Sequence, residues 1–258
     1  MRPTHHIKSA GRMRHRLRAA TASHAQSHGP SALVPRSGRH VILFLAANPT
    51  GTGRLALEQE CAAIERELHM TTGRDDFDFR SKWAVGVDEV MRSLNELQPT
   101  IIHFSGHGSD ANLATWPKAA GERGGVAAEA AGIQLQDDLG APQHVDACAL
   151  AKMIRSAAPS ARVAVLNACY SDAMAAALCD VVDCVVGMTG AIGDTAARSF
   201  AVGFYRALGH RRSIGNAVDQ AVATLAAKRL PGEHLPACRT REGVDARRVT
   251  LQPISNPG

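Results

Sequence analysis

Short, uninterrupted apolar runs recur along the chain and indicate buried strands. A strand covered on both faces of a parallel sheet reads as a continuous apolar stretch rather than an alternating one. Four runs have this form: Val41–Ala46, Ile101–Phe104, Val163–Leu166 and Cys184–Met188. Residues 77–85 alternate loosely, and we predict a fifth strand there.

Between these runs, apolar residues recur at the spacing of an α-helix. In residues 55–69 the apolar positions recur three or four residues apart, and Val87–Leu97 shows the same pattern before Pro99. Asp146 is a suitable N-cap for a helix that continues to about residue 157. Three more helices are predicted, over residues 172–179, 194–208 and 213–228.

The remaining segments read as loops, with one extra strand. Gly132–Gln136 alternates like an edge or hairpin strand and is followed by turn residues at 137–140. Residues 109–131 are rich in Ala, Gly and Glu, which is typical of a long surface loop. After residue 230 the chain contains four prolines and is expected to be irregular, except for a short stretch at Arg248–Leu251.

This alternation of strands and helices predicts an α/β fold, a three-layer sandwich with a mainly parallel central sheet. In open sheets of this class, functional sites form beyond the carboxyl ends of the strands. Two segments with reactive side chains follow such ends, residues 105–108 and 167–171. If residues 133–136 belong only to a side hairpin, the two preceding strands are neighbours and these segments meet.

Charge is distributed unevenly between the amino end and the rest of the chain. The 258 residues carry a net charge of +5, yet residues 1–40 contain eight Lys and Arg and no acidic residue. The remaining residues therefore hold 21 basic and 24 acidic side chains. We predict a domain over residues 40–253 and a basic, disordered tail over residues 1–39, which offers at most weak electrostatic contact with nucleic acid.

Several classes of protein are disfavoured by what the sequence lacks. No apolar run reaches the roughly 18 residues of a membrane helix, and no apolar segment follows the basic start as in a signal peptide. The six cysteines show neither a disulfide framework nor a CxxC pair, so we expect free thiols, a cytoplasmic location and no structural metal. Neither a GxGxxG motif nor a complete phosphate loop is present, and no cofactor is expected.

His107 and Cys169 are the residues with the clearest chemical potential. A thiol with an ordinary pKa of about 8.5 is mostly protonated at neutral pH and needs a base or a cation to become a nucleophile. His107 lies between two glycines, which allow close approach, and Cys169 lies at a predicted helix start that favours a thiolate. By spacing alone, a single cysteine after a strand is usually a core residue, and a single His-Gly pair is usually part of a turn. We expect His103, four residues earlier, to be a buried packing histidine.

The two segments resemble the histidine and cysteine boxes of CHAT domains, which adopt the caspase-like fold of separases and metacaspases. The similar stretches are His-Phe-Ser-Gly-His107-Gly and Val-Leu-Asn-Ala-Cys169-Tyr-Ser. The first strand with its loop, the 185–197 segment and the last two helices continue the resemblance in the right order over residues 40–229.

The resemblance implies a role for each matched position. His107 would be the general base or the ion-pair partner of the thiolate, and Cys169 would be the nucleophile that forms an acyl-enzyme. The backbone amides of Gly108 and Cys169 would form the oxyanion hole. Residues 187–191 would offer their backbone to an extended substrate. We expect Asp194 to cap the following helix in preference to lining the pocket. The candidate substrate-binding residues are Asn48, Tyr170, Asp172, Gly187, Met188, Thr189 and Asp194.

Three hypotheses of function remain open at this stage. The first is a cysteine endopeptidase that cleaves protein or peptide substrates, as a bacterial stress or defence effector, with a regulatory protein acting in trans and no membrane partner. The second is a non-proteolytic CHAT-like module that uses the same cleft for binding. The third is a nucleic-acid-associated protein that acts through residues 1–39.

Overall fold

A computed structural model describes residues 38–109 and 131–252. The predictions for the basic tail and for most of the 109–131 loop lie outside these residues. The main sheet has the strand order β2-β1-β3-β7-β8-β9. Its strands are β1 (His40–Ala46), β2 (Phe77–Trp83), β3 (Ile101–Ser105), β7 (Val163–Asn167), β8 (Cys184–Met188) and β9 (Pro236–Thr240). The first five are parallel, and β9 is antiparallel to β8.

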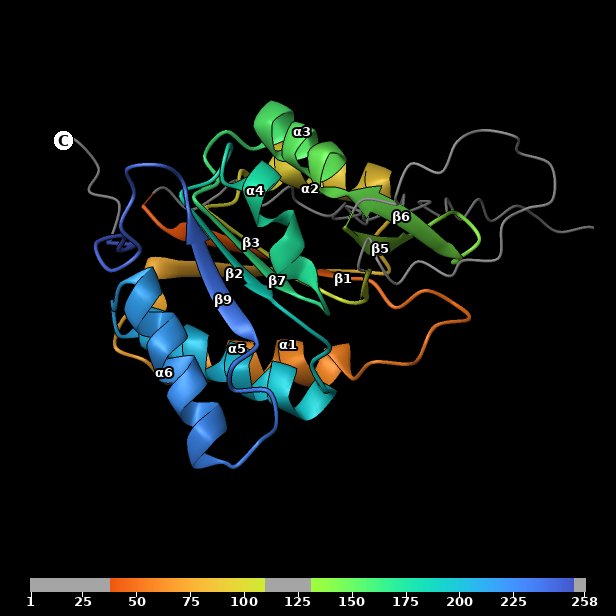
Figure 1. Ribbon diagram of the computed structural model, residues 1–258. Coiled ribbons are helices and arrows are strands. Elements are labelled where there is room, and N and C mark those ends of the chain that lie inside the picture. The colour runs from red at the N-terminus through yellow and green to blue at the C-terminus, as the bar shows by residue number, and fades with distance from the viewer. Residues whose placement is uncertain (1–37, 110–130, 253–258) are drawn as a thin grey trace, which may run out of the picture. The chain divides into compact units, whose positions relative to one another are not determined.

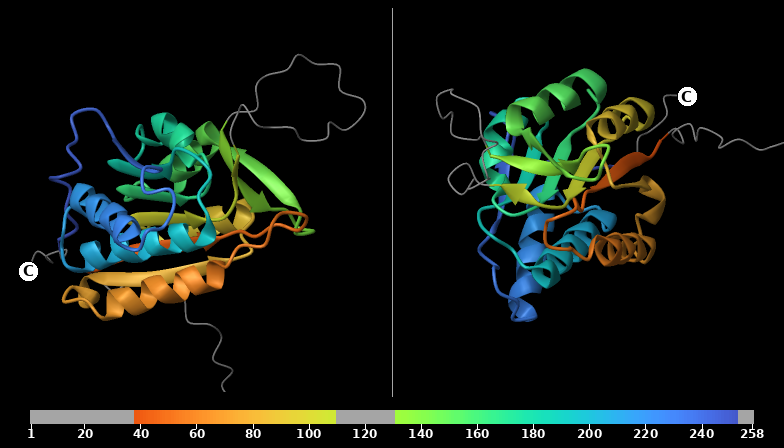
Figure 2. Two further views of the ribbon diagram at one scale, coloured as in Figure 1. Left: turned by 60° about the horizontal axis from the view of Figure 1, so that its bottom comes forward. Right: turned by 90° about the vertical axis from the view of Figure 1, so that its right-hand side faces the viewer.

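Helices cover both faces of this sheet, which confirms the predicted three-layer sandwich (Figures 1 and 2). One face carries α1 (Leu57–His69), α5 (Asp194–Gly209) and α6 (Ile214–Ala227), and the other carries α2 (Val87–Leu97), α3 (Ala147–Ala157) and α4 (Ala175–Leu178). Alternate residues of β1 enter opposite cores: Ile42 and Phe44 pack under α1 and α5, and Leu43 and Leu45 pack under α2 and α3. The apolar strand runs are therefore explained by burial on both sides.

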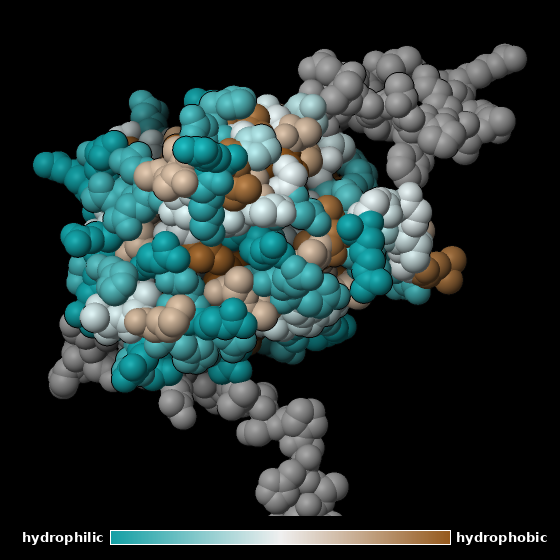
Figure 3. Space-filling view, turned by 90° about the horizontal axis from the view of Figure 1, so that it is seen from below, coloured by the Kyte–Doolittle hydropathy of each residue, from teal (hydrophilic) through white to brown (hydrophobic). Residues whose placement is uncertain are grey.

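Hydrophilic side chains predominate on the outer surface of one helical layer. Seen from the side of α1, α5 and α6, the molecule shows apolar residues only scattered among polar ones (Figure 3). The apolar stripes of these helices are used in the core, where Ile64, Phe200 and Leu225 are fully buried. No helix of the described residues is long and apolar enough to cross a lipid bilayer.

A small second sheet lies beside the main one and confirms the predicted side hairpin. Its strands are β4 (Gly108–Ser109), β5 (Gly132–Gln136) and β6 (Pro142–Asp146), all antiparallel. The sequence predicted only β5, because β6 is half exposed and carries no apolar run. Asp146 caps α3 as expected, and its Oδ1 accepts a hydrogen bond from Ala149 N at 2.8 Å.

The prediction for the end of the chain was wrong. Residues 236–240 form the edge strand β9, and Arg248–Leu251 forms no strand, although Val249 and Leu251 are buried. β9 begins at Pro236, and an edge strand tolerates proline at its first position. The segment has no alternating apolar pattern, since it pairs on one side only and stays half-buried. The predicted 172–179 helix is a 3-10 turn, η2 (Ser171–Met174), followed by the short α4.

Candidate active site

The ends of β3 and β7 bring the two predicted segments together. Ser105 and Asn167 are the last residues of these strands and lie directly opposite each other in the parallel register. His107 and Cys169 each follow two residues later, at the carboxyl edge of the sheet. The expectation that the two strands are neighbours is confirmed by the strand order.

Gly108 makes the closest approach between the two segments. A Cβ atom at this position would lie 2.1 Å from the carbonyl oxygen of Cys169 and 3.2 Å from the Ala168 Cβ. Gln134 N donates to His107 O at 2.9 Å, so Gly108 and Ile133 form a non-hydrogen-bonded pair of the antiparallel ladder. The Gly108 N–H therefore points away from β5.

The His107 ring is oriented by a backbone carbonyl. Its Nε2 lies 2.7 Å from Gly53 O, and because a carbonyl only accepts, Nε2 carries the hydrogen. In the neutral ring this leaves the lone pair on Nδ1. Within the described residues no hydrogen bond joins His107 to Cys169; the thiol instead donates weakly to Ile192 O at 3.8 Å.

Asn48 closes the loop that presents the Gly53 carbonyl. Its Oδ1 accepts from Leu55 N at 3.3 Å, and its Nδ2 donates to Leu55 O at 3.2 Å. Since each end of this amide makes one hydrogen bond to Leu55, Asn48 shapes the loop from within.

Asp194 supports the same loop and does not cap its own helix. The N-cap of α5 is Gly193, with Asp194 as the first helical residue, so the predicted cap is wrong. Its Oδ2 instead accepts a hydrogen bond from Ala56 N, just before α1, at 3.1 Å. The local sequence could not reveal this acceptor role, because the partner lies 138 residues away.

The loop after Cys169 is held in an unusual conformation. Tyr170 is half-exposed and adopts left-handed backbone angles (φ 58°, ψ 14°), which are uncommon for a residue with a side chain. Its N–H donates to Gly190 O at 3.2 Å. The buried Ser171 hydroxyl donates to Leu166 O at 2.7 Å and accepts from Met188 N at 3.0 Å. Only a four-residue 3-10 turn follows, so the predicted helix-start support for a thiolate is smaller than expected.

The predicted substrate edge at residues 187–191 is largely occupied by the protein itself. Gly187 and Met188 are buried, and the Met188 N–H is used by Ser171. The Thr189 N–H and hydroxyl both donate to Leu235 O, at 2.9 and 3.1 Å. Of the predicted stretch, Thr189 and Ala191 are exposed and Gly190 is half-buried, so its accessible part is limited to residues 189–191.

The Asp172 carboxylate already has a charged partner. Arg239 of β9 binds it through two hydrogen bonds, of 3.0 and 2.8 Å. The Asp172 side chain is 15% exposed, and that of Arg239 is 57% exposed. A carboxylate neutralised in this way presents little charge to a substrate.

The thiols differ in their surroundings. All six cysteines are unpaired. Burial raises the pKa of Cys61 to about 11, and a hydrogen bond with Cys238 raises the pKa of Cys184. The same hydrogen bond lowers the pKa of Cys238, which makes this half-buried thiol a competitor in any labelling experiment.

Two contributors to the site were not predicted from the sequence. The Gly53 carbonyl is a backbone group, and no side-chain motif marks it. Glu60 is a buried carboxylate that contacts the ends of β3 and β7. It interrupts the apolar stripe of α1 between Leu57 and Ile64. A charged residue in such a stripe indicates a buried polar role, so Glu60 could have been recognised from the sequence.

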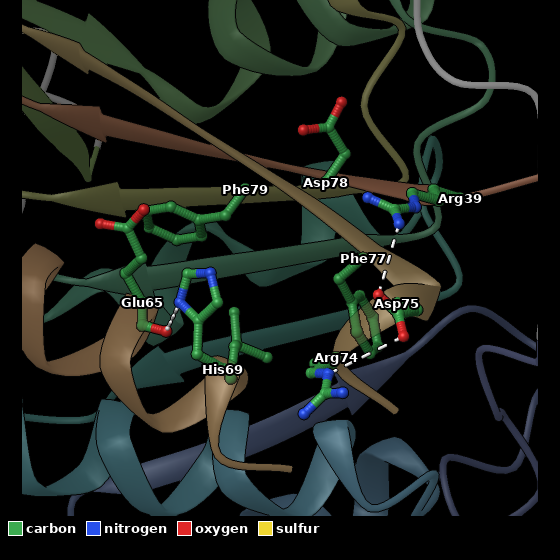
Figure 4. A pocket seen from close by; sticks show the side chains of 9 residues that line it. Arg39, Glu65, His69, Arg74, Asp75, Phe77, Asp78 and Phe79 are labelled. Carbon is green, nitrogen blue, oxygen red and sulfur yellow. Dashed lines mark hydrogen bonds and ion pairs between the residues drawn. The ribbon is translucent and has the colours of Figure 1, made fainter. Parts of the chain in front are cut away.

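A separate pocket of about 330 Å³ lies at the opposite end of the sheet (Figure 4). It is lined by the starts of β1 and β2 and the end of α1. Asp75 pairs there with Arg39 and Arg74, at 3.5 and 3.8 Å. None of the residues that line the pocket belongs to the His107 site. Among the described residues no group of His, Cys, Asp or Glu is arranged to hold a metal ion.

The fold and the paired strand ends define a caspase-like α/β protein, and solved structures agree. A secreted C11 cysteine protease from Bacteroides thetaiotaomicron, in complex with an irreversible peptide inhibitor, matches with a TM-score of 0.52 at 15% identity, over 74% of this chain and 60% of that chain. The Drosophila initiator caspase Dronc matches with a TM-score of 0.51 at 11% identity, over 86% and 88%. At these identities the likeness shows the fold alone.

The chain belongs to the CHAT domain family, whose model matches residues 6–237. A curated relative, a Roc-COR-CHAT protease from an unknown prokaryotic organism, is 25% identical over 199 residues, or 74% of this chain. The match spans 17% of that relative's length, so the relative is a much longer protein.

Proposed function

We propose that this protein is a cysteine endopeptidase in which His107 and Cys169 form the catalytic pair. The observation that carries the proposal is the contact between Gly108 and the Cys169 backbone, with His107 held by Gly53 immediately beside it. This arrangement gathers a thiol, an imidazole and two backbone amides at one edge of the sheet. The CHAT family match and the relative named as a protease support protein substrates.

The proposed reaction begins when Nδ1 of His107 accepts the Cys169 proton and the thiolate attacks the substrate carbonyl carbon. The Gly108 and Cys169 N–H groups donate to the resulting oxyanion. His107 then gives its proton to the leaving amine as the C–N bond breaks, which leaves a thioester. Water, deprotonated by His107, hydrolyses the thioester and regenerates the thiol. Gly53 O stabilises the imidazolium, because it accepts from Nε2 in both charge states.

An extended substrate would lie along residues 189–191, the accessible part of this segment, in the manner of strand addition. The free thiols support a reducing, cytoplasmic location. A stress or defence role and a regulatory protein in trans are carried over from the family resemblance alone.

The test is a peptide-library digest with the wild type, Cys169→Ala and His107→Ala. Both variants should abolish cleavage. Cys148→Ser is the matched control, because it removes an exposed thiol at the start of α3 and should leave cleavage unchanged. Undiminished cleavage by Cys169→Ala would refute the proposal. A wild type that binds peptides but cleaves none would favour the non-proteolytic interaction module.

A further inference from the structure

Glu60 is a buried carboxylate that contacts the strand ends leading to the proposed catalytic pair. It lies on α1, is 5% exposed, and occupies the apolar face of the helix together with Cys61 and Ile64. An ionised group in such a place is costly unless several donors surround it. An apolar side chain would suit this position better if packing were its only purpose.

Three donors surround the Glu60 carboxylate. Oε1 accepts from Asn167 Nδ2 at 2.9 Å and lies 3.0 Å from His103 Nε2. Oε2 accepts from the Ser105 hydroxyl at 3.0 Å. Ser105 and Asn167 are the paired last residues of β3 and β7, so one carboxylate joins the ends of the two strands that lead to His107 and Cys169. We call these two contacts the Glu60 bridge.

The rest of the network keeps Glu60 an acceptor. His103 is completely buried, stacks on Phe44 with ring centroids 5.0 Å apart, and has its Nδ1 3.0 Å from the Tyr205 hydroxyl. Burial and the nearby Glu60 charge raise the pKa of Tyr205, so the phenol keeps its proton and donates to Nδ1. With the phenol donating to Nδ1, the ring hydrogen lies on Nε2 and is donated to Glu60.

We infer that Glu60 is a positioning residue for the proposed catalytic pair: the Glu60 bridge sets the separation of the two strand ends and thereby that of His107 and Cys169. The inference rests on the proposed function. His107 and Cys169 each lie only two positions beyond the strand end that Glu60 contacts. A shift of either strand end is therefore passed on to the reactive residue that follows it. A misplacement of about 1 Å can cost roughly a hundredfold in rate.

Four variants separate a positioning role from simple core stability. Glu60→Leu removes every contact, and Ser105→Ala removes one arm of the bridge. Glu60→Gln can keep the bridge, because its oxygen still accepts from Asn167 and its amide can donate to a Ser105 hydroxyl that turns to accept. Tyr205→Phe is the matched control, since it deletes a buried hydroxyl of the same network and leaves both strand-end contacts intact.

The readout is the pH profile of Cys169 alkylation by iodoacetamide, resolved by peptide mass spectrometry in a Cys148→Ser/Cys238→Ser background. Thermal melts verify folding, and cleavage of a library-derived peptide gives kcat. We expect Glu60→Leu and Ser105→Ala to move the alkylation midpoint toward that of a free thiol and to lower kcat by about tenfold or more. Glu60→Gln and Tyr205→Phe should stay close to the wild type.

His107→Ala is the reference that separates the two proposals. If it leaves the Cys169 profile unchanged, the catalytic pair fails and the inference fails with it. If His107→Ala shifts the profile while Glu60→Leu and Ser105→Ala do not, only the inference is overturned. A shift in Tyr205→Phe as large as in Ser105→Ala would also overturn it. If Glu60→Leu does not fold, the comparison of the Cys169 alkylation profiles of Ser105→Ala and Tyr205→Phe tests the inference instead.

Discussion

The carbonyl oxygen of Gly53 accepts the Nε2 hydrogen of His107 at 2.7 Å, across 54 residues of sequence. This contact selects the ring tautomer and leaves Nδ1 free for proton transfer. The carbonyl belongs to a loop whose shape depends on Asn48 and Asp194 rather than on secondary structure.

Asn48→Ala should lower kcat by about tenfold, because the loop loses the two bonds that close it and the Gly53 carbonyl is no longer directed at His107. Steady-state cleavage of a peptide substrate measures the effect. Asn95→Ala is the control, since its exposed amide donates only to Met91 O within α2 and should leave kcat unchanged. Equal rates for Asn48→Ala and the wild type would exclude this role.

Gly108→Ala should abolish cleavage while the domain remains folded. The new methyl group would meet the Cys169 carbonyl oxygen at 2.1 Å, so the two segments must separate and both proposed oxyanion donors move. Gly193→Ala is a matched glycine control, because a Cβ there meets nothing within 4 Å. Cleavage assays and circular dichroism give the result, and retained activity in Gly108→Ala would argue against the oxyanion site.

Asp172→Asn should leave the P1 preference unchanged, because Arg239 already neutralises this carboxylate. Loss of a pair with so exposed an arginine should cost only about 0–1 kcal/mol of unfolding free energy. Peptide-library profiling and chemical denaturation test both statements. A selective loss of cleavage after Arg or Lys would instead place Asp172 in the substrate pocket.

His40 should make the domain less stable as the pH falls. Burial, the largest cause, lowers the pKa of His40 below its ordinary value of 6.5, and the Gln252 carbonyl only partly opposes this effect. Below pH 6.5 the unfolded chain binds a proton at His40 that the folded ring resists. The contribution of His40 to the free energy of unfolding is therefore complete above pH 6.5 and is lost as the pH falls toward the pKa of the folded state.

Denaturation midpoints of the wild type and His40→Asn at pH 7.5, 6.5 and 5.5 would measure this effect. The advantage of the wild type should shrink toward acid pH, while other titrating groups cancel in the difference. A constant difference over this range would contradict the assignment.

The core strands could be predicted from the sequence because of their burial. The runs at Val41–Ala46 and Val163–Leu166 are apolar because both faces are buried, and burial is written into local composition. β6 and β9 escaped prediction because half-exposed edge strands are stabilised by backbone pairing, which leaves little trace in side-chain pattern. Asp194 was assigned as a cap from its position, but its acceptor role depends on Ala56 in a distant loop.

The sequence by itself determined the layered α/β architecture and the order of its core elements, and it indicated that His107 and Cys169 follow adjacent strands. Only the tertiary structure decided which groups surround them: the Gly53 carbonyl on the imidazole, Arg239 on Asp172, and Glu60 under both strand ends. The physical reason is that hydrophobic burial acts through short periodic patterns. Hydrogen-bond partners are chosen by proximity between segments that lie 45 to 107 residues apart.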